Sequence, residues 1–191
     1  MNTARYRYAA GALCLAGLLC TGPASAFEKQ HHLGVGTGMT LLGAAQSPVS
    51  LGGAVGAFYT YGLTDQFNLL VEGSFALQSY VTSPVSDKDA TIPKVRPQYV
   101  GGGGAGVAYV LDVLQWVPYG GLLFGVNTFS GGTMAGTVVS PDAVLAIGLD
   151  YQFSRKVTLG GAFRQHFALT QLSTYPSYTQ LFLKLEYTWG Y

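Results

Sequence analysis

The chain has 191 residues, with 10 Lys and Arg against 9 Asp and Glu, so its formal net charge is +1. This near-neutral net charge excludes the strong excess of basic residues by which proteins bind nucleic acid. Charged residues make up only 10% of the chain, whereas Gly, Tyr and Phe are abundant. This composition favours a chain with much apolar surface.

The first 26 residues are predicted to be a secretory signal peptide. Two arginines form a positive n-region, and the apolar run at 9–19 is too short to span a bilayer as a helix. The Ala-Ser-Ala triplet at 24–26 fits a small-x-small cleavage site. A lipoprotein signal at Cys20 is the alternative, but Leu19 precedes it where a small residue is expected.

The mature chain is then residues 27–191, a single-domain length. Cleavage removes Arg5 and Arg7, which leaves 8 basic against 9 acidic residues, and it removes both cysteines, Cys14 and Cys20. We therefore expect no disulfide and no Cys-based metal site. Because no mature segment approaches 18 consecutive apolar residues, the exported chain is either a soluble β-protein or an outer-membrane barrel, which satisfies its backbone hydrogen bonds by closing its sheet.

Alternation of apolar with small or polar residues, at a period of two, predicts a series of β-strands. The fifth strand is rich in glycine, and its alternation leaves open which residues face outward. In chain order, the predicted strands span residues 31–43, 51–61, 67–79, 98–111, 116–127, 143–153, 157–168 and 181–191.

The last predicted strand carries the clearest alternation. Every second residue from Leu181 is a large aliphatic or aromatic one, whereas Lys184 and Glu186 lie on the other face. The apolar face ends in three aromatic residues, as expected where a strand leaves a bilayer through an aromatic girdle. We interpret this stretch as the closing strand of a membrane barrel.

The predicted connections alternate in length after the first hairpin. Short turns on the periplasmic rim and long loops outside are typical of outer-membrane barrels, and an even strand number places both termini in the periplasm. The predicted fold is an all-β, eight-stranded antiparallel up-and-down transmembrane β-barrel. The short turns are at 62–66, 112–115 and 154–156, and the long loops are at 80–97, 127–142 and 169–178.

This pattern resembles the small eight-stranded outer-membrane barrels of the OmpA transmembrane-domain and OmpX type along the whole mature chain. The most specific features are the cleavage site, the YGLTD turn at 61–65 and the terminal LEYTWGY at 185–191. Barrels of the OmpW type, linked to passage of small apolar molecules, are a second resemblance.

The resemblance implies a role for the terminal aromatic residues. In that family the last strand is the signal read by the barrel-insertion machinery and usually ends in Phe. Here the matching residues are Tyr187, Trp189 and Tyr191, so the chain ends in Tyr instead. The implied partners are this machinery, periplasmic chaperones and outer-membrane lipids.

The few charged residues within predicted strands are expected to point into the barrel. An eight-stranded barrel has just enough interior for its own side chains. We therefore predict a structural charge network that fills the lumen, with an ion path or gate as the functional alternative. The predicted members of this network are Glu72, Asp150, Arg164, Lys184 and Glu186.

His166 is the residue that raises the possibility of an enzyme. This region resembles the lipid A deacylases, which use a lipid-facing His and a Ser two residues on. Here residue 168 is Ala, and alternation turns His166 inward, so the nucleophile of an acyl transfer is missing. Adjacent His31 and His32 lack a third ligand and are expected on a solvated rim rather than at a metal. We predict no catalytic residue, cofactor or metal.

Together these patterns predict a non-enzymatic integral protein of the outer membrane, structural or surface-binding, with a side-chain-filled lumen. A narrow pore or lateral channel for small solutes is the main alternative, followed by a lipid-modifying enzyme. A soluble β-sandwich is the alternative fold. The predicted outer loops contain no recognisable binding motif, and surface binding follows only from their place on such a scaffold.

Overall fold

The computed structural model describes residues 29–43, 49–79, 96–111, 113, 115–170, 173 and 177–190. The predicted signal peptide and Tyr191 therefore lie outside the described residues. No helix in the described part of the chain is long and apolar enough to cross a membrane. The strands are β1 (His31–Gly43), β2 (Ser50–Gly62), β3 (Phe67–Ser79), β4 (Tyr99–Val110), β5 (Trp116–Ser130), β6 (Val138–Gln152), β7 (Val157–Ala168) and β8 (Ser177–Trp189).

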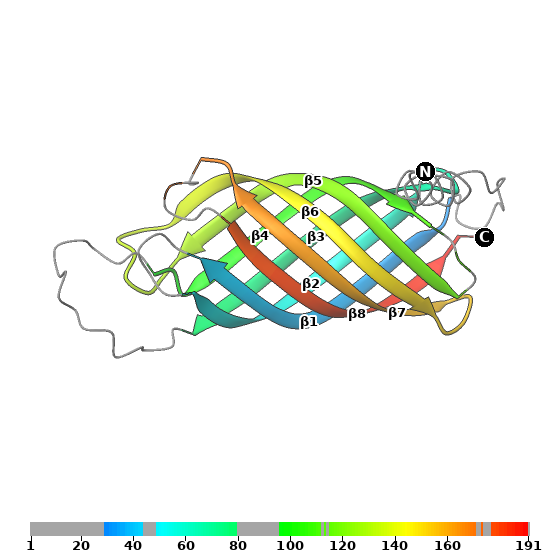
Figure 1. The fold of residues 1–191 in the computed structure, drawn as a ribbon, viewed down its shortest axis with the longest axis horizontal. Helices are drawn as coiled ribbons and strands as arrows, with labels where there is room; N and C mark the ends of the chain where they lie inside the picture. The colour runs from blue at the N-terminus through cyan, green and yellow to red at the C-terminus, as the bar shows by residue number, and fades with distance from the viewer. Residues whose placement is uncertain are drawn as a thin grey trace, which may run out of the picture.

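Each strand pairs antiparallel with the next, and β8 pairs with β1, so the sheet closes into a barrel (Figure 1). The predicted fold class is confirmed. The row of paired residues that starts at Asn68 passes through all eight strands and returns to β3 at Gln78, ten residues further on. This stagger tilts the strands against the barrel axis, as Figure 1 shows.

The two ends of the barrel differ. At one end, called the turn end here, lie the β2–β3, β4–β5 and β6–β7 connections, together with Lys29 before β1 and Gly190 after β8. The opposite end, called the loop end, carries the connections after β1, β3, β5 and β7. An even number of antiparallel strands requires this arrangement, because the last strand ends where the first begins.

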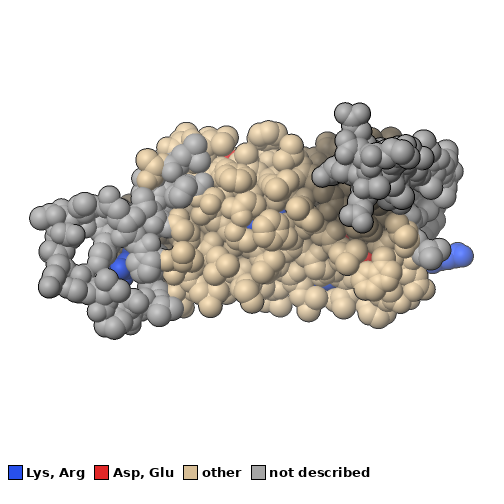
Figure 2. Space-filling model, in the orientation of Figure 1, with Lys and Arg blue, Asp and Glu red and all other residues tan. Residues whose placement is uncertain are grey.

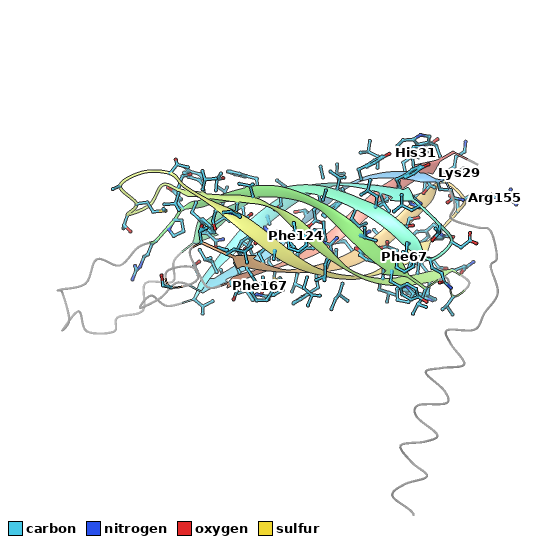
Figure 3. The ribbon with its side chains drawn as sticks, turned by 90° about the horizontal axis from the view of Figure 1, so that it is seen from above. Lys29, His31, Phe67, Phe124, Arg155 and Phe167 are labelled. Carbon is cyan, nitrogen blue, oxygen red and sulfur yellow. The ribbon has the colours of Figure 1, made fainter. Side chains whose placement is uncertain are left out.

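Side chains alternate between two environments along every strand. Outward positions carry large apolar residues, such as Val35 and Leu183, which are 66% and 58% exposed. The face seen in Figure 2 is accordingly almost free of charged atoms between its ends, and Phe67, Phe124 and Phe167 project from the wall in Figure 3. The acidic and basic residues of the strands all point inward: Glu72, Asp142, Asp150, Arg164, Lys184 and Glu186.

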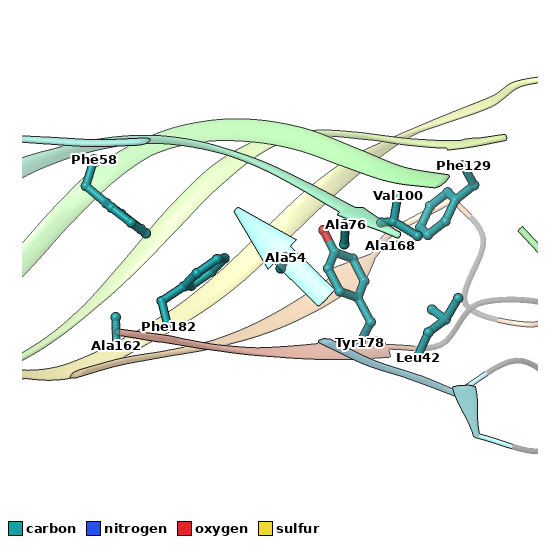
Figure 4. Close-up of a cluster of buried hydrophobic side chains, with 10 residues drawn as sticks. All are labelled: Leu42, Ala54, Phe58, Ala76, Val100, Phe129, Ala162, Ala168, Tyr178 and Phe182. Atoms are coloured by element: carbon teal, nitrogen blue, oxygen red, sulfur yellow. The ribbon is translucent and has the colours of Figure 1, made fainter. Parts of the chain in front are cut away.

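Apolar side chains fill the lumen near the loop end. Leu42, Val100 and Phe129 are buried there, and Tyr178 packs edge-on against Phe129 with ring centroids 6.1 Å apart (Figure 4). Nearer the middle, the rings of Phe58 and Phe182 meet edge to face at 5.3 Å. Side chains packed in this way fill much of the loop half of the lumen.

Three strands extend by three or more residues into predicted loops. β5 extends to Ser130 and β6 begins at Val138, so the loop expected at 127–142 shortens to 131–137, while β8 begins at Ser177 rather than 181. The added residues include polar ones that face the lumen, and polar residues within a strand resemble loop residues in sequence. The structure also shows that the odd-numbered residues of β5 point inward.

Candidate functional site in the barrel lumen

The strongest concentration of charge lies inside the barrel, in the half nearer the turn end. Arg164, Lys184, Asp150 and Glu186 are each less than 10% exposed, and the Glu72 side chain is 10% exposed. The structure therefore places all five predicted lumenal charges inside the wall. It divides them into two groups, one of Arg164 with Glu72 and the other of Lys184 with Asp150 and Glu186.

The first group is an ion pair that crosses the lumen. Arg164 Nε donates to Glu72 Oε2 at 2.7 Å, and β7 and β3 lie on opposite sides of the ring of eight strands. The same guanidinium donates to the carbonyls of Phe163 and Ile147 and to the Tyr119 hydroxyl, at 3.0, 3.3 and 3.3 Å. Because several partners satisfy its donors, this charge is stabilised although it is almost fully buried.

The second group shares one cation between two carboxylates. Lys184 Nζ donates to Asp150 Oδ2 at 2.9 Å and to Glu186 Oε1 at 2.7 Å, and it lies 4.8 Å from the centre of the Tyr119 ring. Glu186 Oε2 is 3.9 Å from His32 Nδ1. Tyr119 thus contacts both groups, since Arg164 donates to its hydroxyl.

A glycine makes room for the second group. Asp150 and Lys184 belong to β6 and β8, and Gly160 of the intervening β7 is the register partner of both. The two side chains meet over a residue with no side chain of its own. A Cβ at position 160 would overlap Asp150 Oδ1 and come 3.0 Å from Lys184 Cε.

A small cavity adjoins these charges. It holds about 40 Å³ for the centres of water-sized molecules, and its wall continues to Asn68 and Gln152 near the turn end. Since one water needs roughly 10–15 Å³ of such space, the cavity has room for a few waters. Two buried acceptors in its wall, Asn68 Oδ1 and Asp150 Oδ1, receive no hydrogen bond from the described residues, which suits a hydrated interior.

A further buried network, centred on His166, lies closer to the loop end. His166 points inward, with Nδ1 2.6 Å from Asp142 Oδ2 and Nε2 3.1 Å from Gln180 Oε1. The Tyr178 ring stacks on the imidazole, with centroids 4.1 Å apart and an interplanar angle of 6°. Ser74 Oγ donates to the same Gln180 oxygen at 3.1 Å.

Sequence reasoning missed Asp142, because it fell in a predicted loop. The alternation that turns Ala146 and Asp150 inward extends back to position 142 and would have found it. The His166–Asp142 pair resembles a general base with its orienting carboxylate, but the other imidazole nitrogen faces an amide oxygen. Acyl transfer requires a nucleophile beside its base, and Ser74 donates to Gln180 instead.

The two adjacent histidines of β1 point to opposite sides. His32 is buried in the lumen, 3.0 Å from Thr188 Oγ1, so the expectation of a solvated rim was wrong for this residue. His31 faces outward, stacks on Trp189 at 5.4 Å and lies 2.8 Å from the Tyr59 hydroxyl. Two side chains that diverge in this way cannot share an ion. Among the described residues, no three His, Cys, Asp or Glu side chains are grouped to hold a metal.

The terminal aromatic residues lie on the outer wall. Tyr187 and Trp189 are exposed on β8, with ring centroids 6.2 Å apart, whereas Tyr191 is outside the described residues. Their role as a barrel-insertion signal stays a prediction.

Solved structures show which known proteins share this fold. Neisserial surface protein A (NspA) matches with a TM-score of 0.65 at 12% identity, over 84% of this chain and 99% of that one. Ail, the attachment invasion locus protein of Yersinia pestis, gives 0.55 at 10% identity, over 85% and 99%. The N-terminal β-barrel domain of Pseudomonas aeruginosa OprF gives 0.54 at 13% identity, over 85% and 98%.

The fold is therefore that of the small eight-stranded outer-membrane barrels, and the resemblance drawn from the sequence is confirmed at this level. No protein-family model matches the sequence, and no curated protein matches it.

Removing the cation of the pair that crosses the lumen should destabilise the barrel. In Arg164→Ala, Glu72 becomes a buried carboxylate without its partner, which costs roughly 3–5 kcal/mol. We expect a lower thermal transition, measured by the loss of heat-modifiable migration on a denaturing gel. Arg155→Ala, at an exposed turn, is the control. An unchanged transition in Arg164→Ala would contradict a stabilising network.

Neighbouring glycines on β7 provide a matched test of the second group. Gly160→Ala should displace Asp150 from Lys184 and lower the thermal transition, because its Cβ overlaps the carboxylate. Gly161→Ala should leave the transition unchanged or raise it slightly, since nothing lies within 4 Å of its Cβ position. Equal transitions for the two variants would show that the Asp150–Lys184 contact does not depend on the bare glycine.

Proposed function

We propose that this chain is an integral β-barrel protein of the outer membrane of a Gram-negative bacterium, non-enzymatic and structural or surface-binding. The observation that carries the proposal is the inverted distribution of side chains. All acidic and basic residues of the described strands face inward, while the outward positions form an apolar belt. Such a surface suits lipid and would be poorly soluble in water.

Two further features support this location. The closed sheet pairs every strand on both sides, which a strand needs where no water can satisfy its backbone. Aromatic side chains also gather on the outer wall at the turn end, as in the interfacial girdle of membrane barrels. They are His31, Tyr59, Tyr61, Phe67, Tyr109, Trp116, Tyr151, Phe153, Tyr187 and Trp189.

In this proposal residues 1–26 are cleaved on export, and residues 27–191 form the barrel domain. The turn end faces the periplasm and the loop end faces outward. A surface-binding role is in keeping with the fold shared with a protein named for the bacterial surface and another named for attachment and invasion. The charge network then acts as a filling that stiffens the wall.

The filled lumen distinguishes this role from that of a pore. The Arg164–Glu72 pair crosses the interior, and Phe129 and Tyr178 pack the loop half. We expect no stable conductance steps when the barrel is inserted into a planar lipid bilayer. Stable steps in symmetric salt would instead support the alternative of a narrow pore for small solutes.

Paired substitutions of phenylalanine test the membrane location. Phe124 lies near the middle of the wall and Phe67 at the turn end, and both side chains are exposed, at 66% and 45% (Figure 3). Phe124→Lys should lower the free energy of unfolding from lipid vesicles by about 2–4 kcal/mol, and Phe67→Lys by about 0–1 kcal/mol. Equal effects of the two changes in vesicles, or a barrel that stays soluble without detergent, would contradict a membrane-embedded wall.

A further inference from the structure

The β6–β7 turn places two cationic side chains just beyond the aromatic belt. Arg155 and Lys156 are exposed, and neither side chain makes an ion pair or hydrogen bond with a described residue. The turn itself is held in place, because Ser154 Oγ accepts hydrogen bonds from the backbone N–H groups of Lys156 and Val157 at 3.3 and 3.1 Å. The two charges therefore project from a fixed backbone.

This turn lies next to the pair of strands that closes the barrel, β8 and β1. The Lys156 carbonyl accepts a hydrogen bond from the Thr188 N–H at 2.9 Å, which sets the turn beside the end of β8. Trp189 is then the register partner of His31 on β1, and Lys29 lies two residues before His31. Figure 3 shows Lys29, His31 and Arg155 at this same end.

Aromatic rings form the surface directly below these cations. His31 stacks on Trp189, and on the other side Phe153 packs edge-on against Tyr151 at 4.9 Å. In a bilayer such rings lie at the boundary between acyl chains and headgroups. Cationic groups just beyond them reach the level of the lipid phosphates, where an anionic leaflet attracts Lys and Arg.

The opposite side of the same end differs in charge. The β2–β3 turn, residues 63–66, carries Asp65 and no Lys or Arg. The described cations of the turn end thus gather on the arc from the β6–β7 turn to the start of β1, rather than being spread evenly around the rim.

We propose that this arc, formed by Arg155, Lys156, Trp189 and His31, binds the phosphate groups of anionic phospholipids in the leaflet that surrounds the turn end. The inference rests on the proposed membrane location and adds a lipid preference to it. The cations attract the phosphate, and the aromatic rings hold the adjoining glycerol and upper acyl region. The site is on the outer wall and is independent of the lumenal charges.

The test uses Trp189 as a local reporter. The Trp116→Phe variant leaves Trp189 as the single tryptophan of the mature chain. The refolded barrel is inserted into phosphatidylcholine vesicles that contain a fixed fraction of acyl-brominated lipid, either phosphatidylglycerol or phosphatidylcholine. Quenching of Trp189 fluorescence then measures which lipid resides beside it. We expect phosphatidylglycerol to quench more strongly at low ionic strength, and we expect this preference to fall with added salt.

Charge-neutral variants in the same background locate the preference. Arg155→Gln with Lys156→Gln should reduce it on the order of fivefold for each cation removed. Arg96→Gln, the same type of change at the loop end, should leave it unchanged. Equal quenching by the two lipids, or a preference that survives the double substitution, would overturn the site.

Insertion is scored separately, by heat-modifiable migration and by recovery of the protein with the vesicles. A chain that stays in the aqueous phase overturns the membrane location and the lipid site together. A barrel that inserts normally but shows equal quenching overturns only the lipid site. A preference lost in Arg96→Gln and kept in the double variant would also refute the site.

Discussion

The pairing of β1 with β8 is the constraint on which the rest of the structure depends. Once these strands join, the sheet has no free edge, and backbone groups are paired around the whole ring. A closed sheet has only an inside and an outside, so each side chain is assigned to one of two environments. The apolar belt, the inward charges and the aromatic rim all follow from that assignment combined with a period of two.

The interior that results is an electrostatic problem, because four carboxylates and two permanent cations share a narrow space with two histidines. The structure distributes these groups among three separate sets of oppositely charged or polar partners. Arg164 satisfies Glu72 across the lumen, Lys184 serves Asp150 and Glu186, and Asp142 faces His166. Apolar side chains near the loop end, such as Leu42 and Phe129, lie between these groups and the loops. Opposite charges attract each other more strongly inside a protein than in bulk water, even beside a small hydrated cavity.

The outer wall has an organisation of its own along the barrel axis. Its middle is mostly aliphatic, with Phe124 among the exceptions, its turn end is aromatic, and the described cations appear on it only where the strands stop. This sequence of zones matches the change from acyl chain to headgroup across half a bilayer. The proposed lipid site lies where the aromatic and cationic zones meet, beside the β8–β1 pair. A ligand can therefore be bound on the outer wall, whereas the lumen is filled by side chains.

Alternation in the sequence was sufficient to predict eight strands, the fold class and the inward direction of Glu72, Asp150, Arg164, Lys184 and Glu186, but it left the facing of β5 open. It failed at Ser140 and Asp142, where polar lumenal residues in the first part of β6 resembled a loop. Only the tertiary structure decided which charges meet. Partners across a barrel depend on its stagger, which is a property of the closed ring, so Arg164 reaches Glu72, 92 residues away, rather than a residue on an adjacent strand. The role of Gly160 also depends on the tertiary structure, because only the pairing of β7 with both β6 and β8 brings Asp150 and Lys184 together over this residue.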